Sequence, residues 1–151
     1  MAIYTTSQSR VSGKAKAQGS ATQEVVIPFI VAVTTGMIDN ANDEVGLAWV
    51  PKGFVPTGIV FNVTDMDTST GLLFDVGDDS DENRWLAAVS GQAAATFATL
   101  DPAALLYKYT DRTLIKAYVN TAATSGAAGT IKGVLKGLVN EEFDTTPLVA
   151  A

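Results

Sequence analysis

Alternating apolar residues between positions 57 and 89 constrain the fold more than any other feature of this sequence. Two runs carry the pattern, and their apolar members are Ile59, Phe61 and Val63, then Leu72, Phe74 and Val76. Because side chains of a strand point to opposite faces with period two, these six residues can share one face of an antiparallel pair. The intervening residues 65–69, DMDTS, are turn formers of hairpin length. We therefore expect a hairpin here, followed by a third strand at 84–89, as the centre of the fold.

Five more segments have strand composition: 24–34, 45–50, 105–109, 112–120 and 130–139. The first is the most apolar, and its inward residues are expected to be Val25, Ile27, Phe29, Val31 and Val33. Pro28 would point the other way and has no N–H to donate, which predicts an edge strand or a bulge. In 112–120 the apolar residues also alternate. Asp101 and Pro102 could begin a helix of one or two turns, as an N-cap followed by proline.

Residues 130–139, TIKGVLKGLV, fit both a helix and a strand by spacing. Gly133 and Gly137 would each cost a helix interior about 1 kcal/mol relative to alanine, and the flanking segments are all strand-like. A strand is therefore preferred. About eight short antiparallel strands at this spacing predict an all-β fold, a single-domain β-sandwich resembling a jelly roll, over residues 24–140.

The two ends of the chain differ from this domain. Residues 1–23 are rich in Ser, Gly, Ala, Thr and Gln and cannot bury enough apolar surface to fold alone. We expect them to form an extended N-terminal arm that lies along a partner, with partner-binding residues Tyr4, Arg10, Lys14 and Lys16. Residues 141–151, EEFDTTPLVAA, are acidic and then apolar, and we expect them to form a C-terminal tail, either a second arm or a frayed terminus.

Composition excludes several kinds of chemistry. The chain of 151 residues has no cysteine and no histidine, which removes disulfides, thiolate metal sites and the commonest general base. Residues 1–23 carry three basic residues and no acid, while the remainder carries seven basic and sixteen acidic residues. An acidic body of this kind repels phosphate, so we expect no nucleic-acid partner. No apolar run is long enough to cross a membrane, no cofactor is expected, and nothing in the sequence indicates an enzyme.

One acidic loop has the composition of a cation site. Asp75, Asp78, Asp79 and Asp81 supply hard oxygen ligands that could hold Ca²⁺. The segment is not an EF-hand, because Arg84 stands where that loop needs glycine. An irregular calcium site therefore remains a weak candidate beside the plainer interpretation, a solvated connection between two strands.

The aromatic residues allow a second function. Trp49, Trp85, Tyr107, Tyr109 and Tyr118 could form a sugar-binding platform on a carbohydrate-binding jelly-roll module. The alternative, which we prefer, is that most of them belong to the core and rim of the sandwich.

Two stretches resemble small all-β virion proteins of tailed bacteriophages. Residues 72–88, LLFDVGDDSDENRWLAA, resemble a strand, an acidic turn and an Arg-aromatic strand of such proteins. Residues 110–138 resemble their closing pair of strands, joined by a loop rich in Ala, Thr and Gly. The resemblance implies a head decoration (cement) protein, oligomeric as a dimer or trimer and bound to the major capsid protein. Such a protein would lie on the exterior of the virion, after assembly in the host cytoplasm, and would have no catalytic residues. A tail or head–tail connector subunit is the other virion role that the sequence allows.

Overall fold

The computed structural model describes residues 23–69 and 71–140 of the chain. These residues form eight strands and a single 3-10 turn at Thr35–Met37. The strands are β1 (Gln23–Val33), β2 (Glu44–Val50), β3 (Phe54–Val63), β4 (Leu73–Asp78), β5 (Asp81–Ser90), β6 (Ala95–Phe97), β7 (Thr113–Thr121) and β8 (Gly129–Val139). No helix in the described part of the chain is long and apolar enough to cross a bilayer.

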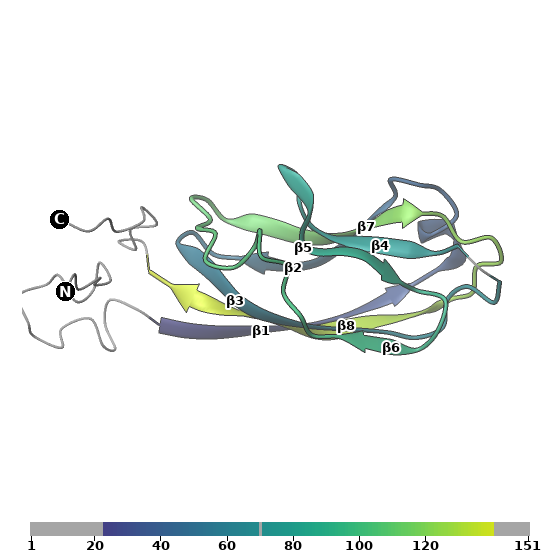
Figure 1. The fold of residues 1–151 in the computed structure, drawn as a ribbon, viewed down its shortest axis with the longest axis horizontal. Helices are drawn as coiled ribbons and strands as arrows, with labels where there is room; N and C mark the ends of the chain where they lie inside the picture. Colours follow the sequence, from purple (N-terminus) through teal and green to yellow (C-terminus); the bar gives the residue numbers. More distant parts are fainter. Residues whose placement is uncertain (1–22, 70, 141–151) are drawn as a thin grey trace, which may run out of the picture.

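The strands form two facing antiparallel sheets with the orders β1-β8-β3-β6 and β2-β7-β4-β5 (Figure 1). Early strands pair with late ones: β1 with β8, β2 with β7, β3 with β6, and β4 with β5. This is the pairing of one long hairpin that has been rolled up, which is how a jelly roll is connected. The predicted all-β sandwich of about eight strands is confirmed.

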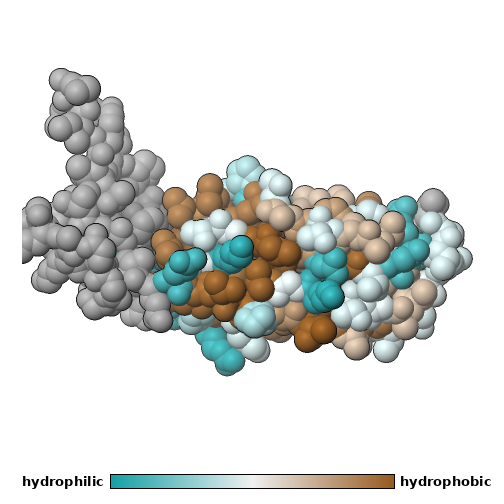
Figure 2. Space-filling model, turned by 90° about the horizontal axis from the view of Figure 1, so that it is seen from below, coloured by the Kyte–Doolittle hydropathy of each residue, from teal (hydrophilic) through white to brown (hydrophobic). Residues whose placement is uncertain are grey.

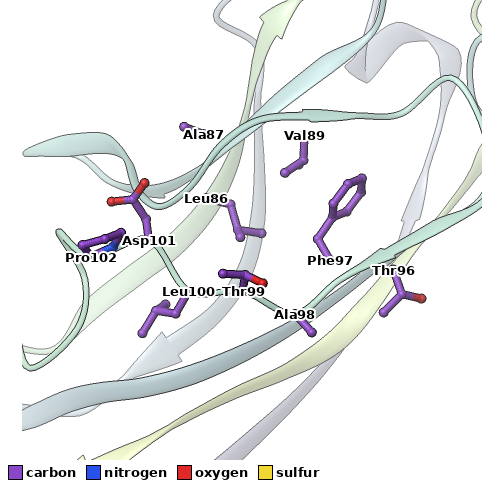
Figure 3. Close-up of a pocket in the computed structure, with 10 residues that line it drawn as sticks. All are labelled: Leu86, Ala87, Val89, Thr96, Phe97, Ala98, Thr99, Leu100, Asp101 and Pro102. Atoms are coloured by element: carbon purple, nitrogen blue, oxygen red, sulfur yellow. The ribbon is translucent and has the colours of Figure 1, made fainter.

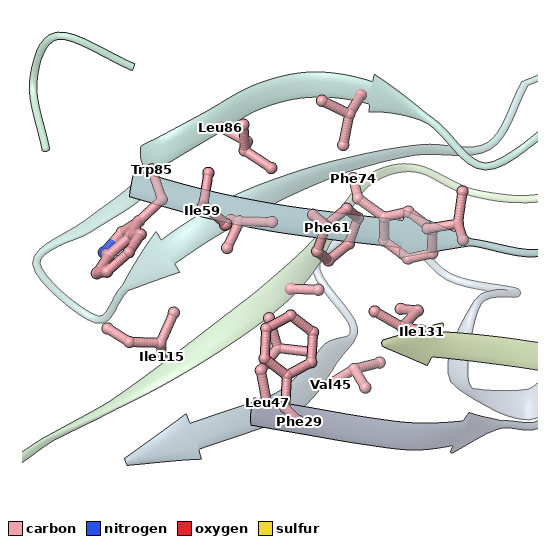
Figure 4. Packing of buried hydrophobic residues seen from close by; sticks show 14 of the residues in the cluster. Phe29, Val45, Leu47, Ile59, Phe61, Phe74, Trp85, Leu86, Ile115 and Ile131 are labelled. Carbon is pink, nitrogen blue, oxygen red and sulfur yellow. The ribbon is translucent and has the colours of Figure 1, made fainter. Parts of the chain in front are cut away.

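The predicted hairpin between β3 and β4 is wrong, although the faces assigned to both strands are right. β3 pairs with β8 and β6, whereas β4 pairs with β7 and β5, so the two strands belong to opposite sheets. Their six alternating apolar residues are buried and meet across the core. The rings of Phe61 and Phe74, with centroids 6.4 Å apart, illustrate this contact (Figure 4).

The hydrogen bonds of Asp67 explain why residues 65–69 connect two different sheets instead of closing a hairpin. The Asp67 carboxylate accepts hydrogen bonds from the backbone N–H groups of Ser69 and Leu72 and from those of Thr124 and Ser125 in the β7–β8 loop. Asp67 therefore ties this connection to the distant β7–β8 loop. Burial acts to raise the pKa of Asp67, but these four backbone hydrogen bonds outweigh it and hold that pKa below its ordinary value.

The segment 105–109 is not a strand, contrary to expectation, and the eighth strand is β6. Leu106 has a φ of 61°, in the left-handed region, which interrupts any extended run. The helix expected at Asp101 is also absent: the Asp101 carboxylate accepts from the N–H of Ala103, and only turns follow.

β1 and β8 agree with the strand predictions for residues 24–34 and 130–139. β1 is an edge strand, and Pro28 lies on its exposed side as expected. β8 is a strand, paired with β1 on one side and β3 on the other. Gly133 is required there, because a Cβ would lie 1.8 Å from the carbonyl oxygen of Val60 and 3.1 Å from the Phe29 ring.

Candidate interaction surface

The outward face of the β1-β8-β3-β6 sheet is unusually apolar. Strand register places Pro28, Val134 and Val60 side by side in one row across β1, β8 and β3. Ile30 lies beside Lys132 in the next row towards the β7–β8 loop, and Val26 beside Lys136 in the row on the other side. A sheet that faces water on one side normally alternates apolar and polar residues, whereas β1 is apolar on both sides.

The exposed fractions show that this face is open in the single chain. Val26 is 52% and Ile30 74% exposed, the latter the highest value among the large hydrophobic residues described. In Figure 2, brown, hydrophobic atoms gather mainly in the left half of the coloured surface, with teal and white residues between them. A shallow depression of about 710 Å³ lies between these side chains. It is lined by Pro28, Phe29, Ile30, Val60, Asn62, Thr96, Lys132, Gly133 and Val134. We call the surface formed by these outward residues the outer apolar face. Its members are Val26, Pro28, Ile30, Val60, Lys132, Val134 and Lys136.

Two lysines lie in the middle of the outer apolar face, and one glutamate lies at its end. Lys132 and Lys136 point outward from β8, and Glu24 lies at the end of β1 opposite Leu138. Neither lysine forms an ion pair with any residue that the structure describes. Residues 24–140 as a whole carry seven basic and thirteen acidic residues. The face therefore presents exposed apolar groups and two cations on an acidic protein.

The outward face of the other sheet is organised differently. Lys116 on β7 has its Nζ 2.7 Å from a Glu44 carboxylate oxygen and 2.6 Å from an Asp79 carboxylate oxygen. These hydrogen bonds raise the pKa of Lys116 and, together with the Tyr118 hydroxyl, lower that of Asp79. The guanidinium of Arg112 lies 4.3 Å from the centroid of the Trp49 ring. Lys116, Glu44, Asp79 and Arg112 are thus partnered within the chain.

Asp78 is the centre of a buried polar network at the β4–β5 turn. Its carboxylate accepts from Arg84 Nε and from the Tyr109 hydroxyl, both at 2.8 Å, and from Ser80. The Tyr109 hydroxyl in turn accepts from the Trp85 indole N–H at 2.7 Å. Burial acts to raise the pKa of Asp78, but the hydrogen bonds from Ser80, Arg84 and Tyr109 outweigh it, and the pKa is lowered. Burial also raises the pKa of Tyr109.

The four carboxylates considered for calcium have separate partners. Asp75 accepts from the Ala88 N–H and the Asn120 amide, Asp78 belongs to the buried network, and Asp79 binds Lys116. Asp81 lies 3.8 Å from Arg84. Within residues 23–69 and 71–140 no cluster of three or more acidic side chains is placed to hold a metal ion. The calcium site stays a prediction without geometric support.

The aromatic residues do not form a sugar-binding platform. Trp85, Tyr109 and Tyr118 are buried. Trp49 and Tyr107 are partly exposed, but each has an arginine over its ring, Arg112 on Trp49 and Arg84 at 3.7 Å on Tyr107. The interpretation of these residues as core and rim therefore accounts for them better.

A cleft of about 430 Å³ opens between the free edges of the two sheets, beside β5 and β6 (Figure 3). It is lined by Leu86, Ala87, Val89, Thr96, Phe97, Ala98, Thr99, Leu100, Asp101 and Pro102. Asp101 is the single ionisable group of this lining, and its carboxylate already caps the following turn. The cleft has no pair of groups that could share acid and base roles.

The predicted partner-binding residues Tyr4, Arg10, Lys14 and Lys16 lie outside the described residues. The sequence interpretation missed the outer apolar face. Its signal was present in residues 24–34, where Val26 and Ile30 alternate with inward residues that are equally apolar. A strand exposed on one side would have polar residues at those positions.

Comparison with known proteins shows which solved structures have a similar fold. No protein-family model matches the sequence, and no curated protein does either. A chain of the Cyanophage Pam1 capsid asymmetric unit is similar over 92% of this chain and 99% of that chain, with a TM-score of 0.71 and 22% identity. A chain of the capsid of Ralstonia phage GP4 is similar over 78% of this chain and 84% of that chain, with a TM-score of 0.62 and 23% identity. This chain shares their fold.

Proposed function

We propose that this protein is a structural component of a bacteriophage virion, a decoration or cement protein that binds the major capsid protein and stabilises the head. The observation that carries the proposal is the fold match to a chain of a phage capsid asymmetric unit, which extends over almost the full length of both chains. Fold alone does not determine function. The features of the molecule itself supply the remaining support.

Three of these features suit a protein that works by contact. The sandwich is rigidly built, with its largest side chains fully buried (Figure 4). The described residues include no group of ionisable side chains arranged for catalysis, because the buried carboxylates are bound to Arg84, Tyr109 and backbone N–H groups. One sheet face exposes apolar area of the kind that marks interaction sites. In the proposed role the protein sits on the capsid exterior as a homo-oligomer.

In the proposed role, residues 1–23 are the capsid tether. They carry Arg10, Lys14 and Lys16 and no acid, so they can contact a partner surface that the acidic body does not suit. An extended segment can also add a strand to a neighbour's sheet through main-chain hydrogen bonds, which requires no distinctive sequence.

Cosedimentation with phage heads tests the tether. Heads lacking the protein are mixed with the full chain, with a chain lacking residues 1–23, and with the triple variant Arg10→Ser, Lys14→Ser, Lys16→Ser. We expect the full chain to sediment with the heads and to raise the temperature at which they release DNA. The deletion should abolish binding while leaving the circular dichroism spectrum and melting of the body nearly unchanged, because it removes only the first residue of β1.

A matched control changes three uncharged residues of the same segment, Thr5→Ala, Ser7→Ala and Ser9→Ala, and should keep binding within about twofold because no charge is lost. Binding that survives deletion of residues 1–23 would contradict the tether. Absence of binding by the full chain would contradict the decoration role. Density for the protein in the tail, seen by imaging of particles, would assign it to the connector or tail instead.

A further inference from the structure

The outer apolar face has properties that select one kind of occupant. It combines exposed apolar side chains, Val26 and Ile30 above all, with two lysines that have no ion-pair partner among the described residues. An occupant that removes this area from water and neutralises these lysines must be apolar and acidic. Direct packing of two such faces about a two-fold axis along the Pro28–Val134 row fits poorly, because it would bring Lys132 of each copy over Lys136 of the other.

Two segments of the chain lie outside the described residues, and their charges distinguish them. Residues 1–22 carry three cations and are polar, so they match neither property of the face. Residues 141–151 carry Glu141, Glu142 and Asp144, and their apolar members are Phe143, Pro147, Leu148 and Val149. The C-terminal segment therefore complements the face in both charge and apolarity.

Length is also compatible. Eleven extended residues span roughly 36 Å, at about 3.3 Å per residue. β8, which runs the length of the face, is itself 11 residues long. An extended copy of residues 141–151 can therefore follow the whole face, which offers both lysines and the depression between them.

The same chain's segment is poorly placed to do this. It continues from Asn140, a buried residue whose N–H donates to the Gly53 carbonyl, at the end of the sheet where Glu24 lies. Folding back at once would place Glu141 and Glu142 beside the Glu24 carboxylate. These two residues are also not turn formers, unlike the Gly, Pro, Asn and Asp that make tight reversals. A neighbouring copy's segment does not have to reverse there.

We propose that residues 141–151 of a neighbouring copy of this chain bind along the outer apolar face, so that the protein self-associates by exchange of C-terminal segments. Lys132 and Lys136 receive the carboxylates of Glu141, Glu142 and Asp144. Val26, Ile30, Val60 and Val134 receive the apolar residues. The inference concerns the purified protein without capsids and is independent of the virion role.

Sedimentation equilibrium of the full chain over a wide concentration range is the first test. We expect concentration-dependent association that weakens as salt is raised, because ion pairs contribute to it. Phe143→Ser, Leu148→Ser and Val149→Ser together should abolish association without changing the melting temperature of the dissociated chain. A fluorescent synthetic peptide of residues 141–151 should bind this variant, whose face is intact.

Charge variants make the test specific. Lys132→Glu in the full chain should weaken association at least tenfold, whereas Arg112→Glu, which changes an exposed cation next to β7 of the other sheet, should change it less than twofold. Combining Lys132→Glu and Lys136→Glu with Glu141→Lys, Glu142→Lys and Asp144→Lys should restore association, because the same pairs form with reversed sign.

Three results would overturn the proposal. The first is association that persists in the triple serine variant, which would mean that the faces pack directly. The second is a chain that stays monomeric at every concentration and whose triple serine variant does not bind the peptide. The third is a monomer that binds added peptide only after its own segment is changed, which would assign the face to the same chain's segment. None of these results bears on binding to phage heads, so the two proposals fail separately.

Discussion

The two sheets of the sandwich bury equivalent inner faces but have unlike outer faces. On β2-β7-β4-β5, Lys116 is held between Glu44 and Asp79, and its side chain is only 15% exposed. On β1-β8-β3-β6, Lys132 is exposed beside Ile30, and no ion pair forms with it in the described part of the chain. The Lys116 ammonium group is thus paired within the chain, whereas the Lys132 ammonium group is not paired with any described residue.

The difference indicates on which face the polar groups find their partners within a single chain. Polar groups in the first sheet are linked both on the surface and inside, where Asp78 joins Arg84 and Tyr109. The second sheet has apolar residues on both sides of β1, and the outward ones, Val26 and Ile30, are exposed to solvent. The chain can fold with such a face exposed, but burying the face against a partner would be favourable.

The largest effect is expected from Asp78, the anchor of the polar sheet. Asp78→Ala should lower the free energy of unfolding by about 3 kcal/mol, because it leaves the Arg84 guanidinium and the Tyr109 hydroxyl without their buried acceptor. Urea denaturation measures this. Asp81→Ala is the matched control on the same turn: Asp81 lies 3.8 Å from Arg84 and is partly exposed, so its loss should cost less than about 1 kcal/mol. Equal losses in both variants would contradict the assignment of Asp78 as the anchor.

Acid should destabilise the protein through the same network. The pKa of Asp78 in the folded chain lies below its ordinary value of 3.8, so its contribution is complete above that pH. It is lost as the pH falls through the lowered folded pKa. Asp67 acts in the same direction. Stability measured by urea denaturation should therefore fall below about pH 4, and Asp78→Asn should show a shallower fall. An identical pH profile in that variant would rule out this contribution.

The sequence predicted which residues face the core better than it predicted which strands pair. Period-two alternation reports the side of a strand and carries no information about its neighbour, so Phe61 and Phe74 were assigned to the core correctly but placed in one hairpin. The segment 105–109 has the composition of a strand, yet the φ of Leu106 prevents one.

The polar network could not be predicted for a related reason. Asp78 and Tyr109 are 31 residues apart, and only the rolled connection of the strands brings them together. The outer apolar face, in contrast, was visible in the sequence of β1, where apolar residues stand at outward and inward positions alike. That pattern indicates a strand covered on both sides.

A smaller change in the free energy of unfolding is expected when one lysine from each face is replaced. Lys116→Met should lower the free energy of unfolding by about 0.5–1 kcal/mol in low salt, because two ion pairs with exposed carboxylates are lost. The loss should shrink when salt screens those pairs. Lys132→Met, measured at concentrations where the chain is dissociated, should change stability by less than about 0.3 kcal/mol, because no ion pair within the described residues is removed. A larger loss from Lys132→Met would mean that the two faces do not differ as described.

The smallest effect on stability is expected at Ile30, the most exposed large hydrophobic residue described. Ile30→Thr keeps a β-branched side chain on an edge strand, so the dissociated chain should unfold within about 0.5 kcal/mol of the unchanged protein. The same substitution at Ile131, which is fully buried on β8, should cost more than about 2 kcal/mol, because it leaves a hydroxyl in the core. Self-association should show the reverse order, weakened by Ile30→Thr although stability is kept. If Ile30→Thr destabilises the dissociated chain as much as Ile131→Thr does, the face is part of the fold itself and not a surface left for a partner.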